Sequence, residues 1–150
     1  MNTATTTPET TVGEVMTTDL VTLKVDDTLR LADDLMNLTQ VHHFPVLDGD
    51  SVAGVVNQSE LLHASMVSLV RHRQDAVRDA LGEVKVKAVM KPATMVSSDT
   101  SIDDAAEILV ERDLECLLVL KEEKLAGLVS RRDLLREIAK KLFVASNRLR

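Results

Sequence analysis

The sequence contains two copies of one unit, and this duplication constrains the fold more than any other feature of the chain. The copies occupy 12–62 and 86–135; they open with VGEVM and VKAVM and close with AGVVNQSELL and AGLVSRRDLL. From Asp26 onward a constant offset of 73 relates the two copies, so that Gly54 corresponds to Gly127. Such a repeat indicates that one supersecondary unit is built twice. Apolar positions on which the copies agree therefore indicate the shared scaffold, and polar positions on which they differ point to a functional site.

The copy boundaries divide the chain into five parts. We expect a disordered tail at 1–11, a first repeat at 12–62, a connecting helix at 63–85, a second repeat at 86–135 and a C-terminal helical extension at 136–150. Units this short bury little core on their own, so we expect the two repeats to pack together.

Each copy is predicted to fold in the order strand, helix, strand, strand, helix, which gives an α+β protein. In the first copy, 20–25 alternates in hydrophobicity as a strand does, and 26–28 supplies acceptors for a helix N-cap. The helix that follows is predicted to bury Leu31, Leu35 and Leu38. The matching helix of the second copy carries its apolar residues at Ile102, Ala105, Ala106 and Leu109.

Two long amphipathic helices are predicted after the hairpin strands of the two copies. The first, at 61–84, has an apolar face that comprises Leu62, Met66, Leu69, Val70 and Val77. The second, from Asp133 to about Leu149, aligns Leu134, Ile138, Leu142 and Ala145. Such faces predict contact with a second subunit, and the alternative is a solvated helix on its own core.

The composition excludes several classes of function. The formal net charge is −6 and the chain has no Trp or Tyr, which argues against nucleic-acid binding and against a site that stacks a base on aromatic rings. No apolar run reaches the roughly twenty residues that a membrane span needs. A single cysteine, Cys116, forms no internal disulfide, which favours a reducing, cytoplasmic location.

The second copy places polar residues where a strand is predicted to end and a helix to begin. The strand 127–129 leads into Ser130, and backbone N–H groups at such a junction favour a phosphate. The Ser130 hydroxyl can donate to a phosphate oxygen, Asp133 can accept the two hydroxyls of a ribose, and Arg131 and Arg132 offer guanidinium groups. The same serine and aspartate also fit a plain helix cap, and the residue chemistry alone leaves both interpretations open.

The first copy departs from this pattern at the corresponding positions. Asn57 replaces the serine and Glu60 replaces the aspartate, while Gln58 and Ser59 bring no charge for a phosphate. Glutamate is one methylene longer than aspartate, which would push a ribose out of register. We therefore expect this site to be empty, weak or suited to a neutral ligand.

These motifs resemble the tandem cystathionine-β-synthase (CBS) domain. The resemblance covers about 12–62 and 86–135 and rests on VxxVM, D-[DT]-[TS]-[LI], the strand FPVL and the closing G-h-h-[ST]-x-x-D-L-L, where h is apolar. It implies two repeats packed with pseudo-twofold symmetry, modules that pair into homodimers, and regulatory binding of AMP, ATP, S-adenosylmethionine or a similar adenosine ligand. It further implies an action on an unknown partner protein, without catalysis. The alternative is an assembly module whose ligand clefts are vestigial.

The resemblance also implies which residues surround each ligand. In the first cleft it places Ser130, Asp133 and Arg132 opposite residues of the first copy, with Val41 against the purine; these are Thr17, Thr22, Val41, His42 and His43. In the second, weaker cleft it places Asn57 and Glu60 near Met95, Leu114 and Cys116.

The sequence argues against a metal site and against a nucleophilic cysteine. Adjacent His42 and His43 cannot both face one point on a strand, and His63 and His72 do not share a helix face, so no metal site is expected. A nucleophilic pair of Cys116 with His43 is disfavoured because a cysteine beside a strand is usually a small buried hydrophobe. No glycine-rich phosphate loop is present, and no catalytic residue is predicted.

Overall fold

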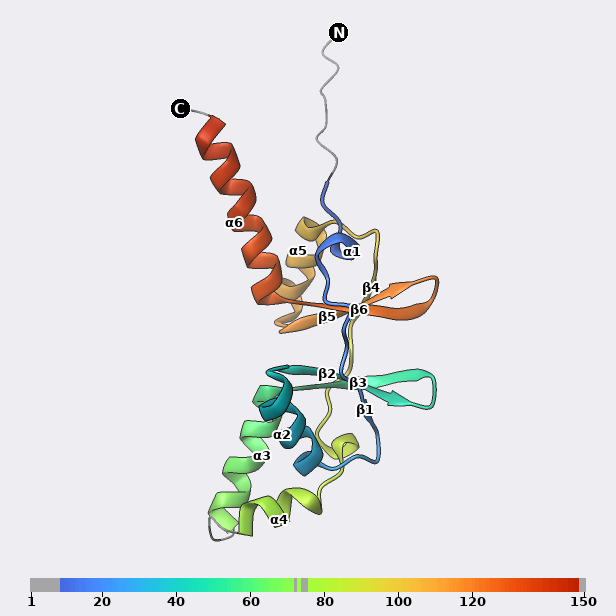
Figure 1. Cartoon of the computed structure of the whole chain (residues 1–150), viewed down its shortest axis with the longest axis vertical. Coiled ribbons are helices and arrows are strands. Elements are labelled where there is room, and N and C mark those ends of the chain that lie inside the picture. Colours follow the sequence, from blue (N-terminus) through green and yellow to red (C-terminus); the bar gives the residue numbers. More distant parts are fainter. Residues whose placement is uncertain (1–8, 72, 74–75, 149–150) are drawn as a thin grey trace. The chain divides into compact units, whose positions relative to one another are not determined.

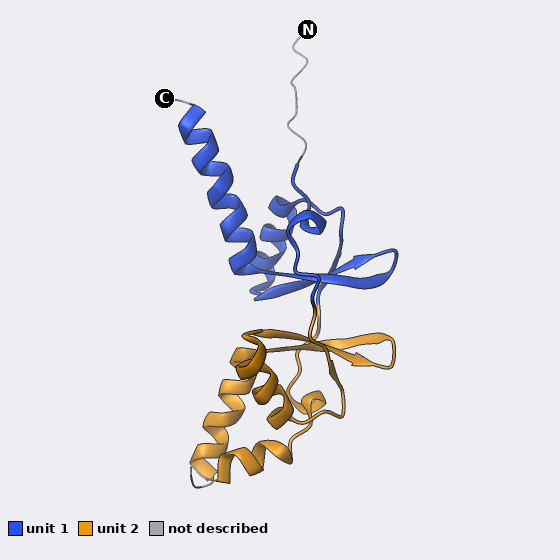
Figure 2. Ribbon diagram, viewed as in Figure 1, with its two compact units in different colours: residues 1–19, 94–150 blue, residues 20–93 orange. Residues whose placement is uncertain are grey.

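The computed structural model of the protein describes residues 9–71, 73 and 76–148 (Figure 1). The chain divides into two compact units, which Figure 2 colours separately. Unit 1 comprises residues 1–19 and 94–150, and unit 2 comprises residues 20–93. Most of the tail expected at 1–11, together with His72 and Leu149, lies outside the described residues.

Unit 2 is a three-stranded sheet with helices packed against it. Its elements are β1 (Leu23–Lys24), α2 (Leu29–Thr39), β2 (His43–Asp48), β3 (Ser51–Asn57), α3 (Gln58–Arg71), α4 (Val77–Gly82) and the short 3-10 helix η2 (Val86–Ala88). The sheet order is β1-β2-β3, with β1 parallel and β3 antiparallel to β2. The core comprises Leu23, Leu29, Ala32, Met36, Phe44, Val46, Val56, Leu61, Leu81 and Val86.

Unit 1 repeats this architecture with the second copy. Its elements are α1 (Val12–Val15), β4 (Met95–Ser97), α5 (Ile102–Arg112), β5 (Cys116–Lys121), β6 (Lys124–Ser130) and α6 (Arg131–Arg148). The sheet order is β4-β5-β6, again with one parallel and one antiparallel pairing. The core comprises Val12, Ile102, Ala105, Leu109, Leu117, Val119, Val129 and Leu134. The α+β class and the element order predicted for each copy are confirmed.

The two copies exchange their first residues between the units. Val12, which opens the first copy, is fully buried in unit 1 and donates its N–H to Thr100 O at 2.8 Å. Val86, which opens the second copy, is fully buried in unit 2 and donates to Asp27 O at 2.7 Å. We call 12–17 and 86–91 the crossing segments, because each packs on the sheet of the other copy. The repeats of the sequence and the units of the structure therefore differ in these segments.

A glycine in each unit allows the crossing segment to approach the sheet. A Cβ built on Gly127 would lie 2.9 Å from Thr17 O, and one built on Gly54 would lie 2.7 Å from Lys91 O. Both distances are shorter than real Cβ contacts, and each built Cβ also meets the side chain of the preceding methionine, Met16 or Met90. The methionine side chains can move, whereas the backbone oxygens of the crossing segments cannot move without shifting the segment. The glycine that the closing motifs of both copies contain is thus required by this close approach.

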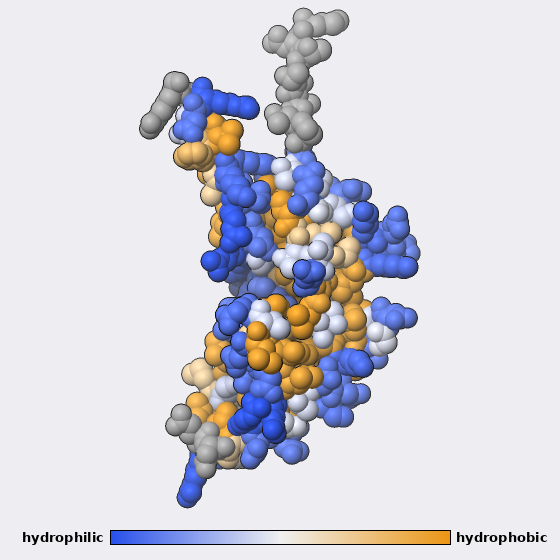
Figure 3. Space-filling model, viewed as in Figure 1, coloured by the Kyte–Doolittle hydropathy of each residue, from blue (hydrophilic) through white to orange (hydrophobic). Residues whose placement is uncertain are grey.

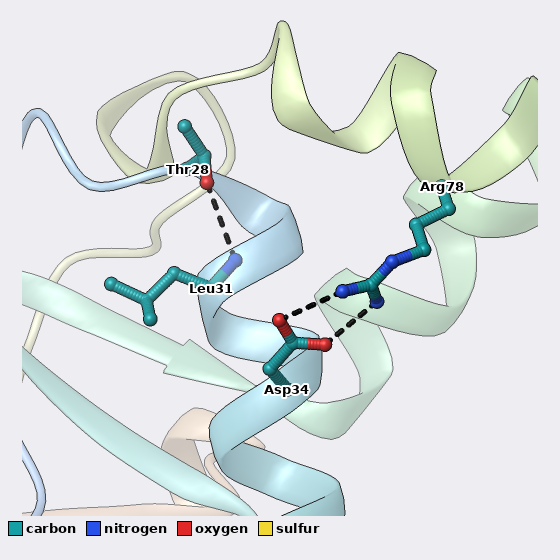
Figure 4. A network of polar contacts seen from close by, with 4 residues as sticks. All are labelled: Thr28, Leu31, Asp34 and Arg78. Atoms are coloured by element: carbon teal, nitrogen blue, oxygen red, sulfur yellow. Dashed lines mark hydrogen bonds and ion pairs between the residues drawn. The ribbon is translucent and has the colours of Figure 1, made fainter.

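The buried face predicted for α2 is wrong at Leu31 and Leu38, whereas Leu35 packs partly buried against the core and the face of α5 is confirmed. Leu31 is 39% and Leu38 79% exposed, and the buried residues are Leu29, Ala32 and Met36. Thr28 Oγ1 accepts the N–H of Leu31 at 3.2 Å, so the helix begins at Leu29 (Figure 4). Leu29, Ala32 and Met36 are spaced by three and four residues along one helix face, and this face meets the core, which turns Leu31 and Leu38 toward solvent. At the offset of 73, these three positions are the buried Ile102, Ala105 and Leu109 of α5.

The single helix predicted at 61–84 is also wrong, because α3 ends at Arg71 and α4 is a separate helix. Arg78 of α4 donates two hydrogen bonds to the Asp34 carboxylate of α2, at 2.7 and 3.0 Å (Figure 4). The hydrogen bond from Arg78 is the main cause of a lowered pKa at Asp34. Leu81 is buried in the core, so α4 closes the side of unit 2 rather than extending α3.

Two smaller boundaries differ from the predictions. The first strand covers Leu23–Lys24 rather than 20–25, because only these residues pair with β2. The last helix begins at Arg131 rather than Asp133, and Leu134 is its one buried residue among 131–148.

Candidate ligand-binding sites

Ser130 and Asp133 form a reciprocal cap at the junction of β6 and α6. The Ser130 N–H donates to Asp133 Oδ2 at 2.9 Å, and Ser130 Oγ accepts the Asp133 N–H at 3.2 Å. This is the capping-box arrangement, so the plain cap interpretation describes the bonds of this structure. The cap leaves one donor and one acceptor for a ligand, because the serine hydroxyl proton and the second carboxylate oxygen take no part in the contacts described for these two residues. Both side chains are half-buried, which leaves them open to a ligand.

The two arginines of the junction differ in their contacts. The Arg131 guanidinium donates to the backbone oxygen of Leu114 and to the Asp113 carboxylate, the latter at 2.7 Å. Arg131 is thereby directed at the loop before β5. Arg132 is exposed, and the ion pairs described for 9–71, 73 and 76–148 include none from it. Of the two guanidinium groups, that of Arg132 remains available to an anion.

Thr17 is the one first-copy residue of the predicted site that lies in the same unit as Ser130. Its N–H donates to Leu128 O at 2.9 Å, and the Leu128 N–H donates back to Thr17 O at 3.0 Å. These bonds fix Thr17 beside β6, close to the strand end at Ser130. Cys116 pairs with Ser130 across β5 and β6 and is buried.

In unit 2 the corresponding junction is filled by its own side chains. The Asn57 N–H donates to Glu60 Oε2 at 2.6 Å, and Ser59 Oγ donates to Glu60 Oε1 at 3.1 Å. Lys91 Nζ lies 3.0 Å from the same Oε1, and the Glu60 side chain is only 6% exposed. Asn57 is itself buried, and its Oδ1 lies 2.8 Å from His43 Nδ1. Both carboxylate oxygens of Glu60 are therefore engaged within the unit.

Lys91 is the site residue that sequence reasoning missed. It stands in the crossing segment of the second copy, where VKAVM-K corresponds to VGEVM-T of the first. Alignment of the two VxxVM frames pairs Lys91 with Thr17, and this signal was present in the sequence.

The other predicted site residues divide between the units. Thr22, Val41, His42 and His43 lie in unit 2, where His42 O accepts the N–H of Gln58 at 2.9 Å and Val41 packs against the core. Met95, Leu114 and Cys116 lie in unit 1. The roles predicted for these residues around a ligand stay predictions.

Unit 2 also contains a groove beside its filled junction. Its volume is about 1040 Å³, and it runs along α3, α4 and the segment from η2 to Lys91. Small apolar residues such as Ala64, Val84 and Val89 form much of its lining, and Glu60 and Lys91 contribute to it. A groove of this size has room for a small molecule.

The part of the chain that the structure describes contains neither a metal-binding cluster nor a membrane-spanning helix. No group of three or more His, Cys, Asp or Glu side chains is placed to hold a metal ion. Nor is any helix there both long and apolar enough to cross a membrane.

The family follows from two β-α-β-β-α units that each close on the same strand–helix junction. The family model described as "CBS domain" matches residues 12–67 and 84–140, most of the chain. The chain belongs to the CBS domain family.

Particular proteins of this family are similar over nearly the whole chain. A CBS domain-containing protein of Dictyostelium discoideum is 29% identical over 127 residues, which cover 83% of this chain and 88% of that protein. The solved structure of CBSX2 in complex with AMP is 29% identical, with a TM-score of 0.67, and covers 87% of this chain and 96% of the other.

Other relatives are much longer proteins. An A-adding tRNA nucleotidyltransferase of Geobacter sulfurreducens is 25% identical over 130 residues, which cover 86% of this chain and 13% of that enzyme. The similarity thus covers a module that occurs both in short proteins and within larger ones.

Proposed function

We propose that this chain is a regulatory module that binds an adenosine-containing ligand and passes the signal to a partner protein. The observation that carries the proposal is the junction of unit 1, where the Ser130 hydroxyl and one oxygen of Asp133 are left for a ligand. Family membership supports it, and so does the AMP complex of CBSX2 at 29% identity. AMP, ATP and S-adenosylmethionine are the candidate ligands.

Each group at this junction has a defined part in the proposed binding. The open carboxylate oxygen of Asp133 accepts a ribose hydroxyl, and the Ser130 hydroxyl donates to a phosphate oxygen. Arg132 adds a charge-assisted contact to a phosphate, in a geometry that suits a guanidinium. None of these steps involves turnover, because a hydrogen-bonded ribose and phosphate are held rather than activated.

Calorimetric titration and thermal unfolding test the proposal on the parent and on Asp133→Asn. The asparagine keeps an oxygen for the Ser130 N–H and removes the charge, so the cap is largely retained while ribose binding weakens. A ligand at 100 times its Kd adds about 2.7 kcal/mol to the stability of the parent. Asp103→Asn, an exposed carboxylate on α5 of the same unit, is the matched control. If none of AMP, ATP, S-adenosylmethionine and NADH binds the parent, the module is not an adenosine sensor.

We further propose that the chain forms a homodimer through α3 and α6. Exposed apolar residues recur at corresponding positions of these helices, where Leu62, Leu69 and Val70 match Leu135, Leu142 and Phe143. Figure 3 shows hydrophobic atoms near the C-terminal end of α6. Because large apolar side chains are exposed at the same positions in both copies, we interpret these positions as a contact surface rather than as scattered exposed residues. Leu38 is as exposed, but its counterpart is Glu111, which marks an ordinary solvent position.

The size of the protein in solution tests this dimer. The variant Leu69→Asp with Leu142→Asp is expected to sediment as a monomer at concentrations where the parent is a dimer. Leu38→Asp is the control and is expected to leave the dimer intact. A parent that sediments as a monomer, or a double variant that stays dimeric, contradicts the proposal. A dimer that binds no ligand would favour the alternative function, an assembly module.

A further inference from the structure

One backbone position is equivalent in the two units but carries chemically different side chains. Thr17 in unit 1 and Lys91 in unit 2 end the crossing segments, and we call them the crossing residues. Thr17 exchanges two backbone hydrogen bonds with Leu128 of β6, and Lys91 exchanges two with Val55 of β3, all at 2.9 to 3.0 Å. Leu128 and Val55 both lie two residues before the end of their strands. The two side chains therefore start from the same place relative to each junction.

The side chains at this position differ in whether they form an ion pair with the junction carboxylate. Lys91 Nζ forms an ion pair with Glu60 at 3.0 Å, in which the lysine side chain is 65% exposed and the glutamate 6%. Thr17 carries no charge, and the ion pairs that the structure describes in 9–71, 73 and 76–148 include none to Asp133. An ammonium on a desolvated carboxylate is a charge-assisted contact, which a neutral ribose hydroxyl does not match.

We propose that the crossing residue decides whether a junction binds ribose: Thr17 leaves Asp133 open, and Lys91 closes unit 2 by occupying Glu60. This inference rests on the proposed function and extends it to the choice between the two junctions. Lack of space does not explain the closure of unit 2, because Glu60 and Lys91 border a groove of about 1040 Å³. The contact with Lys91, together with the extra methylene of Glu60, explains it.

Exchange of the crossing residues tests the inference in both directions. Thr17→Lys is expected to weaken the binding of AMP, or of the adenosine ligand that the parent binds best, by about tenfold or more, because the ligand must displace an ammonium. Lys91→Thr combined with Glu60→Asp is expected to raise the stoichiometry from one ligand per chain to two. Each crossing residue is already accommodated at the equivalent backbone position, which reduces the risk of misfolding.

Lys87→Thr is the matched control. It removes the same charge from the same crossing segment, but Lys87 pairs with the exposed Asp26 at 3.0 Å rather than with Glu60. Affinity and stoichiometry should stay at the parent values. An unchanged affinity in Thr17→Lys overturns the inference for unit 1, and a stoichiometry of one in the Lys91→Thr, Glu60→Asp variant overturns it for unit 2.

A second measurement separates this inference from the proposed function. If the parent binds no adenosine ligand, the proposed function fails, and a double-mutant cycle of Lys91→Thr with Glu60→Gln still tests the contact. The expected coupling is roughly fivefold in the equilibrium constant of unfolding. In the cycle of Thr17→Lys with Asp133→Asn the single variant Thr17→Lys creates the contact rather than losing it, so the coupling relative to the parent should have the opposite sign and a similar size. No coupling in either cycle overturns the inference.

Discussion

The junctions of the two units have the same backbone and different polar side chains, and the comparison separates scaffold from function. In unit 1 the Asp133 carboxylate caps α6 with one oxygen. In unit 2 the Glu60 carboxylate caps α3 in the same way and is also bound by Ser59 and Lys91. The capping bond is thus common to both, and the lysine contact is specific to one. A repeated motif can thus cap a helix in both units, while only the junction of unit 1 is left open to a ligand.

The shared scaffold should give the largest effects on stability, and glycine variants test it. Gly127→Ala and Gly54→Ala each place a Cβ within 2.9 and 2.7 Å of the crossing backbone, so each should lower the free energy of unfolding by about 2–3 kcal/mol. Gly49→Ala is the control for backbone strain: its φ is +60° with no atom near, and about 1 kcal/mol is expected. Chemical denaturation measures all three. Equal losses at Gly127 and Gly49 would contradict a requirement for close approach.

The next largest effect on stability should come from the difference between the Glu60 and Asp133 carboxylates. Glu60→Gln removes a buried charge that accepts bonds from Asn57, Ser59 and Lys91, and a loss of about 1–2 kcal/mol is expected. Asp133→Asn disturbs one described bond and should cost less, about 0.5 kcal/mol. Denaturation curves compare the two directly. A larger loss at Asp133 would contradict the view that unit 2 has the more internally bonded junction.

Helix caps outside the junctions should behave alike in both units. Thr28 caps α2 and Ser101 caps α5 through the same bond, at 3.2 and 3.1 Å. Thr28→Ala and Ser101→Ala should each cost about 1 kcal/mol in thermal or chemical unfolding. A difference well above 1 kcal/mol between them would show that the duplicated scaffold is not energetically equivalent.

The smallest effect on stability should come from acid, and it should act on unit 2, which contains Asp26 and Asp34. A hydrogen bond from Lys87 lowers the pKa of Asp26, and one from Arg78 lowers that of Asp34. Because the folded pKa of each carboxyl lies below the ordinary value of an aspartate, the stabilisation is present above that ordinary value and is lost as pH falls through the folded pKa. Both groups are exposed, so salt should weaken the effect. In Asp34→Asn the free energy of unfolding should fall less steeply with decreasing pH in the acid range than in the parent. An unchanged pH dependence would contradict this prediction.

The sequence predicted the repeated fold well because the apolar positions that set it occur twice. The order of elements, the strand pairs around 48–50 and 121–124 and the buried face of α5 all followed from pattern and turn chemistry. The error in α2 arose because three leucines suggested one face, whereas the face that packs on the core carries Leu29, Ala32 and Met36. The break between α3 and α4 depends on Arg78 and Asp34, which are 44 residues apart and show no local pattern.

The candidate site was predicted in part for a similar reason. Ser130, Asp133, Asn57 and Glu60 were found because they interrupt the agreement between the copies. Lys91 was missed because its contact with Glu60 depends on the exchange of the crossing segments, which pattern within one copy does not reveal. The contact of Arg131 with Asp113 likewise depends on how the loop before β5 packs against α6.

Ligand stoichiometry tests the central claim most directly. Calorimetric titration of the parent with AMP, ATP and S-adenosylmethionine should find one that binds with a stoichiometry of one per chain. Asp133→Asn should weaken that binding strongly, and Asp103→Asn should leave it unchanged. Absence of binding by these three ligands and by NADH, or binding that survives in Asp133→Asn with the parent affinity, would contradict the account.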